Sequence, residues 1–204
     1  MATTKRWKLD KMLKAAVLDN DLGQAEVALT GGANPDQKIE NKGSVFPLLT
    51  LSMFTPAPAM AELLLAHGAN IEATDGQGRT ALHMAIFPAH AIALISAGAK
   101  IQARDPRGDT PLHTTCSKAA AVALVQAGAD PWVLNAQGEL PWQNLQRLLD
   151  VRRPGSMSAP RVHVIEETIA YLRSLVEGEA LERDTDPVTM TQAEEAAKAQ
   201  TGRM

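Results

Sequence analysis

Asp75-Gly-Gln-Gly-Arg-Thr-Ala-Leu-His83 and Asp105-Pro-Arg-Gly-Asp-Thr-Pro-Leu-His113 are two copies of one pattern, placed 30 residues apart. Each copy reads as a tight turn followed by the start of a helix. A glycine supplies the backbone freedom that the turn needs, and the threonine two residues later is suited to cap the helix. A weaker third copy, Asn135-Ala-Gln-Gly-Glu-Leu-Pro-Trp142, follows at the same interval. A fixed period of this length predicts a repeat architecture.

The best-formed parts of this pattern resemble the ankyrin repeat. Thr110-Pro-Leu-His113 and its variant Thr80-Ala-Leu-His83 match the family's signature, and the turns at Gly68-Ala-Asn70 and Gly128-Ala-Asp130 also fit it. The resemblance implies an all-α fold, an α-solenoid of stacked helix-turn-helix repeats with projecting hairpin turns. It also implies that the histidine of the signature is a structural residue that hydrogen-bonds a hairpin loop.

The period divides the chain into repeats and a tail. We expect an ankyrin-repeat domain over residues 1–178, made of four repeats and a C-terminal capping unit, at roughly 8–40, 41–74, 75–104, 105–134 and 135–178. Residues 179–204 are polar and acidic, a composition typical of a flexible tail. The repeats at 75 and 105 are shorter than the usual period of about 33 residues, and we place the missing residues in the link between their two helices.

Composition narrows the class of protein. Hydrophobic residues make up 45% of the chain but aromatic residues only 3%, which favours closely stacked helices built from small aliphatic side chains. The single cysteine, Cys116, excludes an internal disulfide, and we expect it to be an inert thiol in a helix. No apolar run predicts a signal peptide or a membrane span, so the expected location is the cytoplasm, without membrane contact.

The distribution of charge gives no sign of a nucleic-acid partner. The net charge is −3. Residues 1–178 hold seventeen basic and seventeen acidic residues, and the last 26 residues hold six acidic against three basic. A neutral body lacks the basic patch that nucleic-acid binding requires, so we expect no nucleic-acid partner.

The sequence contains no recognisable catalytic or cofactor motif. Its glycines belong to turns, and no histidine has a carboxylate or a cysteine at metal-ligand spacing, so we expect no cofactor, no metal site and no enzyme activity. One alternative stays open. Arg147, Arg152, Arg153 and Arg161 surround a long proline-containing stretch and are able to bind an anion, which leaves an enzyme site there as a remote possibility.

The resemblance places partner binding on the hairpin tips and on the exposed side of each first helix. The residues that this assigns to partner binding are Asn41, Lys42, Ser44, Thr74, Gln77, Arg79, Arg104, Arg107, Asp109, Gln137 and Glu139. Trp132 joins them as a second kind of candidate, because it occupies a turn position normally held by a small polar residue. It either packs inside the last hairpin or serves as an exposed interface anchor.

These expectations favour a non-catalytic protein–protein interaction module that is a monomer by itself. It would bind a protein partner through its concave hairpin and helix face, as an adaptor or as a stoichiometric inhibitor. The alternative is a bacterial immunity protein that neutralises a cognate secreted toxin by occlusion, since small ankyrin-repeat proteins of that kind are often encoded beside such toxins. The partner would then be a toxin or enzyme encoded nearby.

Overall fold

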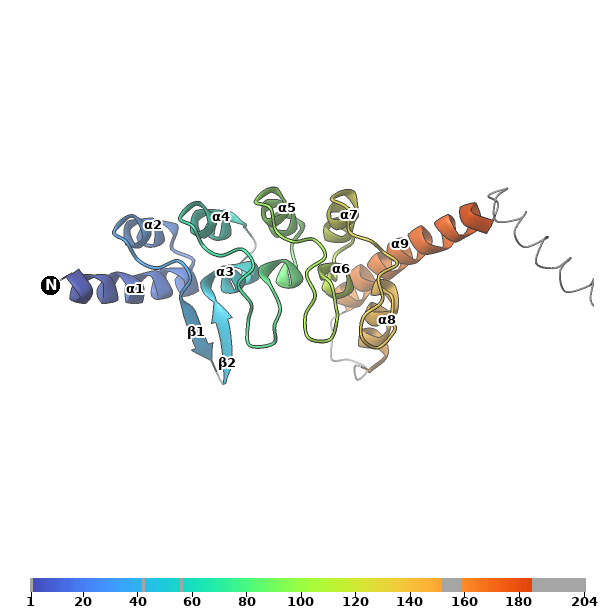
Figure 1. The fold of residues 1–204 in the computed structure, drawn as a ribbon, viewed down its shortest axis with the longest axis horizontal. Coiled ribbons are helices and arrows are strands. Elements are labelled where there is room, and N and C mark those ends of the chain that lie inside the picture. The colour runs from blue at the N-terminus through green and yellow to red at the C-terminus, as the bar shows by residue number, and fades with distance from the viewer. Residues whose placement is uncertain (1, 42, 56, 152–158, 185–204) are drawn as a thin grey trace, which may run out of the picture.

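The chain folds as a row of helix pairs. The computed structural model describes residues 2–41, 43–55, 57–151 and 159–184. Each pair has a first helix and a second helix that returns beside it, and the pairs stack along the long axis of the molecule (Figure 1). The first helices are α1 (Ala2–Asp19), α3 (Leu48–Leu51) with the 3-10 turn η1 (Ser52–Phe54), η2 (Ala81–Met84), α6 (Pro111–Thr114) and α8 (Pro141–Val151). The second helices are α2 (Leu22–Thr30), α4 (Ala59–Ala66), α5 (Pro88–Ser96), α7 (Lys118–Gln126) and α9 (Ala159–Asp184).

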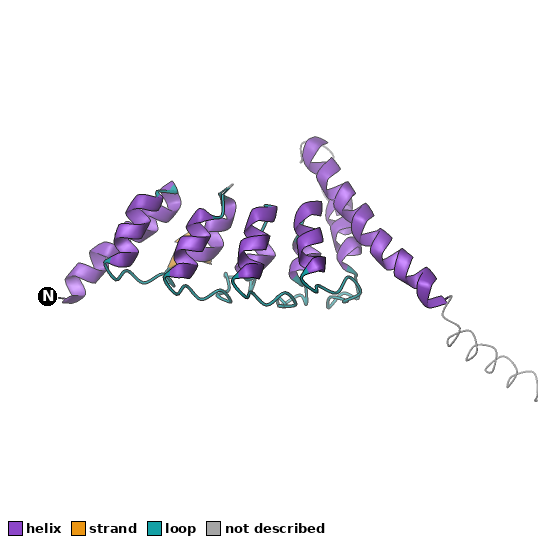
Figure 2. Cartoon of the chain, turned by 90° about the horizontal axis from the view of Figure 1, so that it is seen from above, coloured by secondary structure: helices purple, strands orange, loops and turns teal. Residues whose placement is uncertain are grey.

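The hairpins project from one side of this row, and the second helices α2, α4, α5 and α7 lie on the other side (Figure 1). The first hairpin is formed by strands β1 (Lys38–Asn41) and β2 (Ser44–Pro47), which pair antiparallel. The later hairpins are turns without strands. In the view from above, the loops that lead to the hairpins follow one edge of the stack, and the short links between paired helices lie at the opposite edge (Figure 2).

The core repeats with the same period as the turns. Each second helix from α4 to α7 buries an alanine and, three residues later, a leucine, all at most 1% exposed. These are Ala61 and Leu64, Ala91 and Leu94, and Ala121 and Leu124. Because an alanine alternates with a leucine at the same place in each layer, neighbouring helices interdigitate closely without aromatic side chains.

The structure corrects the expected place of the missing residues. Residues 87–90 are not a compressed link, because α5 begins at Pro88, where the missing N–H of proline is tolerated. The shortening falls on the first helices instead, because η2 and α6 are single turns of four residues. Cys116 accordingly lies in the link between α6 and α7 and not in a helix.

The α-solenoid implied by the resemblance is the observed architecture. The last helix extends further than expected, since α9 runs to Asp184 and passes the boundary placed at residue 178. Residues 185–204, the larger part of the expected tail, lie outside the described residues. Within the described part of the chain, no helix combines the length and apolar character needed to span a bilayer.

Candidate functional site

The hairpin tips are built around one side-chain acceptor. The Oδ1 atom of Asp75 accepts hydrogen bonds from the backbone N–H groups of Gln77 and Arg79, both at 2.9 Å. Asp105 and Asn135 make the same pair of bonds in the next two tips, at 2.8–3.0 Å. All three acceptor residues are 6% exposed. Because a buried acceptor ties two N–H groups of each turn, the three tips share one backbone shape.

Glycine is required in these turns for two reasons. Gly78, Gly108 and Gly138 have φ values of 75°, 74° and 75°, a left-handed conformation that other residues rarely adopt. A Cβ atom at Gly108 would also lie 2.9 Å from the backbone nitrogen of Ala136 in the next tip. The tips therefore approach each other as closely as their backbones permit.

Backbone hydrogen bonds join two of the three pairs of neighbouring tips, and at the remaining junction the donor position is held by Pro106, which has no N–H. The N–H of Ala136 donates to the carbonyl oxygen of Arg107 at 2.9 Å, and the N–H of Gly76 donates to the carbonyl oxygen of Val45 in β2 at 2.8 Å. Arg104 adds a side-chain bridge, since its Nη1 donates to the carbonyl oxygen of Leu134 at 3.0 Å. The projecting edge is thus a connected surface, not a set of separate loops.

The signature histidines support the hairpins from within. The Nδ1 atom of His83 accepts from the backbone N–H of Thr80, so its proton is on Nε2, which donates to the carbonyl oxygen of Asp109 at 3.0 Å. His113 does the same for Glu139 at 3.1 Å. Burial lowers the pKa of both histidines, which keeps the rings neutral and able to accept at Nδ1. The structural role implied for these histidines is confirmed.

The predicted partner-binding residues differ in accessibility. Five are exposed on the tips: Thr74, Gln77, Arg104, Arg107 and Gln137. Ser44, Arg79, Trp132 and Glu139 are half-buried, and Asp109 is buried. Asn41 ends β1 opposite Ser44, but its side chain and the whole of Lys42 lie outside the described residues.

Asp109 does not face a partner as we expected. It is 1% exposed, its carboxylate accepts a hydrogen bond from Asn135 Nδ2 at 2.8 Å, and its own N–H donates to Asp105. The turn directs this side chain inward, toward the next hairpin, because the two tips meet there. Asp109 is therefore a structural residue that couples neighbouring tips.

The three arginines of the tips are in different environments. Arg79 has a side chain only 21% exposed, and its guanidinium donates twice to the Oδ2 of Asp75, at 3.0 and 2.8 Å. Arg104 is held by carbonyl oxygens. Arg107 is the most available, since its side chain is 57% exposed and its Nε lies 3.5–3.7 Å from the carboxylates below it. Among the described arginines of the tips, Arg107 is the cation most available to a partner.

The interpretation of the sequence missed Leu134. This residue is 51% exposed and stands 30 positions after Arg104 and 60 after Thr74, at the same place in its own hairpin. Its position in the repeat was sufficient to find it, but a single leucine in a sequence does not by itself indicate a binding residue. The exposed tips therefore combine arginines with an accessible aliphatic side chain, a composition found in protein interfaces.

Trp132 lies on the same loop as Leu134. Its backbone N–H donates to Asp130 Oδ1 at 2.8 Å, a turn that fixes the position of the residue, and its side chain is half-buried. A half-buried indole is consistent both with packing in the hairpin and with use as an anchor.

Of the four arginines of the alternative anion site, the structure describes Arg147 and Arg161. Arg147 forms an ion pair with Glu139 at 2.9 Å and also donates to Asn144. Arg161 is exposed on α9, and residues 152–158, which include Arg152 and Arg153, lie outside the described residues. Among the described residues no group of three histidine, cysteine, aspartate or glutamate side chains is placed to hold a metal ion.

Comparison with known protein families agrees with the geometry. Residues 56–95 match the family model described as ankyrin repeats (many copies). This span contains α4, the hairpin at 75–79, η2 and all but the last residue of α5. This segment of the chain consists of ankyrin repeats, in agreement with the resemblance. A search of curated proteins found no match. Ankyrin repeats generally mediate protein–protein interaction and are typically non-catalytic.

Proposed function

We propose that this ankyrin-repeat protein is a non-catalytic module that binds a partner protein through its row of hairpin tips and the adjoining first helices. The observation that supports the proposal is that some positions of each tip are buried and others are exposed. The first residue of each tip, which is Asp75, Asp105 or Asn135, is buried and holds the turn, whereas the second and third residues, which differ between tips, are exposed. A surface whose scaffold is constant and whose exposed positions vary is suited to specific recognition.

Rigidity of the row supports the same proposal. Backbone bonds between tips and the two histidine bonds hold the exposed side chains in fixed relative positions before any partner arrives. Binding to such a surface orders few additional groups, so less conformational entropy is lost. Arg107 and Leu134 are the side chains that we expect to contribute most, with Gln77 and Gln137 on the flanks.

The role that fits a domain of this size is that of an adaptor or a stoichiometric inhibitor acting by occlusion in the cytoplasm. An immunity protein that neutralises a toxin encoded by a neighbouring gene is the special case of that role in which the occluded partner is secreted. In both cases the protein would be a monomer until it meets the partner.

The test is co-purification with the products of the flanking genes, followed by size-exclusion chromatography and titration calorimetry. We expect a stable one-to-one complex that Arg107→Glu weakens roughly tenfold or more, because charge reversal at an interface arginine removes an interaction and adds repulsion. Thermal stability should fall only slightly, since Arg107 is exposed and loosely paired, although the new carboxylate lies near those of Asp105 and Asp109.

The matched control is Gln126→Glu on α7, which introduces the same charge on the opposite side of the stack. It should leave the complex intact. A complex that survives Arg107→Glu and Leu134→Ser together, or that is lost equally in the control, would refute binding through the tips. Inhibition of an enzymatic or toxic activity of the partner in proportion to occupancy would distinguish an inhibitor from an adaptor.

A further inference from the structure

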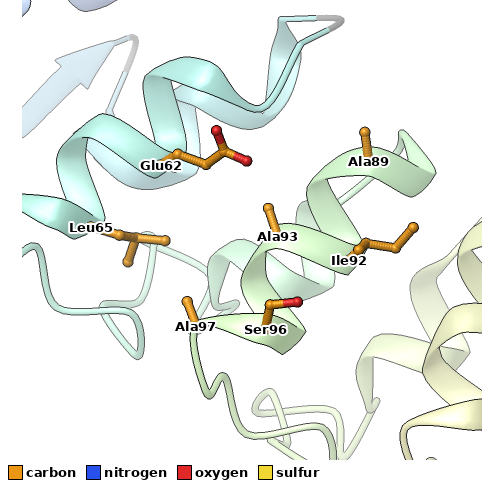
Figure 3. Close-up of a pocket in the computed structure, with 7 residues that line it drawn as sticks. All are labelled: Glu62, Leu65, Ala89, Ile92, Ala93, Ser96 and Ala97. Atoms are coloured by element: carbon orange, nitrogen blue, oxygen red, sulfur yellow. The ribbon is translucent and has the colours of Figure 1, made fainter.

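A groove lies between α4 and α5, on the side of the molecule away from the hairpin tips. It encloses about 560 Å³ and is open to solvent. Glu62 and Leu65 line it from α4, and Ala89, Ile92 and Ala93 are among the residues that line it from α5 (Figure 3). The groove runs between two parallel second helices and is separate from the surface proposed above.

The groove exists because α5 presents small side chains to α4. Alanines stand at successive turns of this face of α5, and Ser96 continues the row. Leu65 on one side and Ile92 on the other form walls of larger aliphatic side chains. A furrow with a floor of alanine and aliphatic walls has the dimensions and the character that accept branched aliphatic side chains from another helix.

The apolar surface continues beyond the groove to the start of α5. Ile86 and Phe87 in the link before this helix are 38% and 36% exposed, and Ile92 is 54% exposed. Phe54, the last residue of η1 in the preceding repeat, is 52% exposed. Large apolar side chains that gather over one helix and its neighbouring link mark an interaction surface more often than a solvated face.

Charge identifies the kind of partner that this surface fits. Helix α5 contains no acidic or basic residue apart from the buried His90, so its exposed face is uncharged. Glu62 is the one ionisable side chain that lines the groove, and it forms no ion pair with any described residue. An exposed carboxylate without a cation, at the rim of an apolar furrow, is complemented by a lysine or arginine of a partner.

A second copy of this chain is a poor occupant. Two grooves that met face to face about a two-fold axis would each bring a carboxylate, and neither would bring a cation. The like charges of the two Glu62 side chains would then be desolvated together, which is unfavourable. The complement has to come from a different chain.

We propose that the groove between α4 and α5 docks an amphipathic α-helix of a partner protein, with an aliphatic stripe seated over the alanines and a lysine or arginine paired with Glu62. The hairpin tips and this groove lie on opposite sides of the stack, so the protein has room for two partners at once and is able to bridge them. The two surfaces share no residue, so binding at one surface can be refuted without affecting the proposal for the other.

The experiment uses the full chain and a displayed library of helical peptides of about 18 residues, since shorter helices are marginal in water. The library varies one face between leucine, alanine and serine at positions i, i+4, i+7 and i+11, and varies the flanks between lysine, glutamate and glutamine. We expect the selected peptides to carry leucine on the face and lysine on a flank. Their affinity is then measured by fluorescence anisotropy.

Ser96→Arg, which places a long cation in the groove, should weaken these peptides roughly tenfold or more. The matched control is Gln126→Arg, at the equivalent position one repeat later and outside the groove, and it should leave their affinity unchanged. Glu62→Lys should weaken the lysine-flanked peptides and strengthen glutamate-flanked ones. All three positions are exposed, and thermal unfolding checks that each variant remains folded.

Three results would overturn the proposal. The first is selection of no peptide above the level seen with the Ser96→Arg variant. The second is binding that is indifferent to Glu62→Lys or that prefers acidic flanks. The third is a dimer in sedimentation velocity that Ser96→Arg abolishes, because the groove would then be covered by a second copy.

Discussion

The hairpin at residues 75–79 and the hairpin at residues 105–109 have one backbone conformation but are stabilised differently. Both place an aspartate at the first position, a glycine with φ near 75° at the fourth, and the same backbone bond between first and fifth residues. In the first hairpin the fifth residue is Arg79, which pairs with Asp75 within the turn. In the second hairpin it is Asp109, which cannot form such a pair.

The second hairpin obtains its stability from its neighbours. Asn135 of the following hairpin donates to the Asp109 carboxylate, and His83 of the preceding repeat donates to the Asp109 carbonyl oxygen. The hairpin at 75–79 has no equivalent of the second bond, because Leu49 stands where the later repeats have histidine. The fifth residue of one hairpin is therefore paired within its own turn, whereas the fifth residue of the other is tied to both neighbouring repeats.

A turn of fixed geometry can thus be stabilised by contacts within itself or by contacts with the neighbouring repeats. Substitutions in the hairpin at residues 75–79 should mainly disturb that turn. Substitutions in the hairpin at residues 105–109 should also loosen the tips on either side. The following predictions test that difference.

Asp105→Ala should have the largest effect, about 3 kcal/mol of unfolding free energy. The substitution leaves the N–H groups of Arg107 and Asp109 without their buried acceptor, and it disturbs the contact with Asn135. Equilibrium denaturation in urea measures the loss. Asp105→Asn is the matched control and should cost much less, because the chain itself uses Asn135 at the equivalent position. Equal losses for the two variants would contradict this account of the turn.

Gly108→Ala should lower the unfolding free energy by about 2 kcal/mol, and Gly138→Ala by about 1 kcal/mol. Both substitutions force alanine into a left-handed conformation. Only the Cβ at 108 would also meet the backbone of Ala136 at 2.9 Å, since a Cβ at 138 has nothing within 4 Å. The difference between the two, measured by urea denaturation, isolates the close approach of the hairpins. No difference would mean that the tips are not tightly packed.

Arg79→Gln should cost about 1 kcal/mol, whereas Arg107→Gln should change the unfolding free energy by less than about 0.5 kcal/mol. Arg79 is mostly covered and satisfies the buried Asp75, but Arg107 is exposed and its contacts are long. Thermal unfolding of both variants and of the double variant would measure this. A larger loss at Arg107 would place that side chain in the scaffold and remove it from the proposed interface.

The smallest effect, counted for each residue, should be a decrease in the free energy of unfolding at mildly acidic pH. Burial lowers the pKa of His83 and His113 in the folded protein, while the unfolded chain takes up protons below pH about 6.5. Stability should therefore be constant above neutral pH and fall as the pH drops through 6.5, by at most about 0.8 kcal/mol for each buried histidine at pH 6.0. Urea midpoints at pH 7.5 and 6.0 give this difference.

The variant that tests the source of this acid sensitivity is His83→Gln with His113→Gln. Glutamine retains the acceptor, as Gln143 does for the N–H of Leu140 at 2.8 Å, but it does not titrate. The variant should be less stable at every pH, because the bond to the next hairpin is lost, yet its stability should depend less on pH. His90, whose pKa is also lowered by burial, accounts for the remaining dependence. An unchanged dependence would refute the assignment to the signature histidines.

Much of the scaffold was predictable from residue types at fixed spacing. The turn glycines, the capping threonines and the histidines recur every 30 residues because every layer must make the same turn, and the structure gives each of them the expected role. The candidate surface was less predictable. Asp109 reads as an exposed charge, and only the adjoining hairpin, with Asn135 as donor, makes it a buried acceptor.

The sequence by itself determined that this chain is a stack of ankyrin-type repeats, because local turn and capping chemistry has a short range and is repeated in register. Tertiary structure decided which side chains remain available. Arg79 is engaged within its own turn, Asp109 is engaged by the next turn, and a groove opens between α4 and α5 because most of the α5 side chains that line it are alanine or serine. Those outcomes depend on which repeats become neighbours in the stack and on the distance between them. The spacing of residues along the chain does not determine that distance.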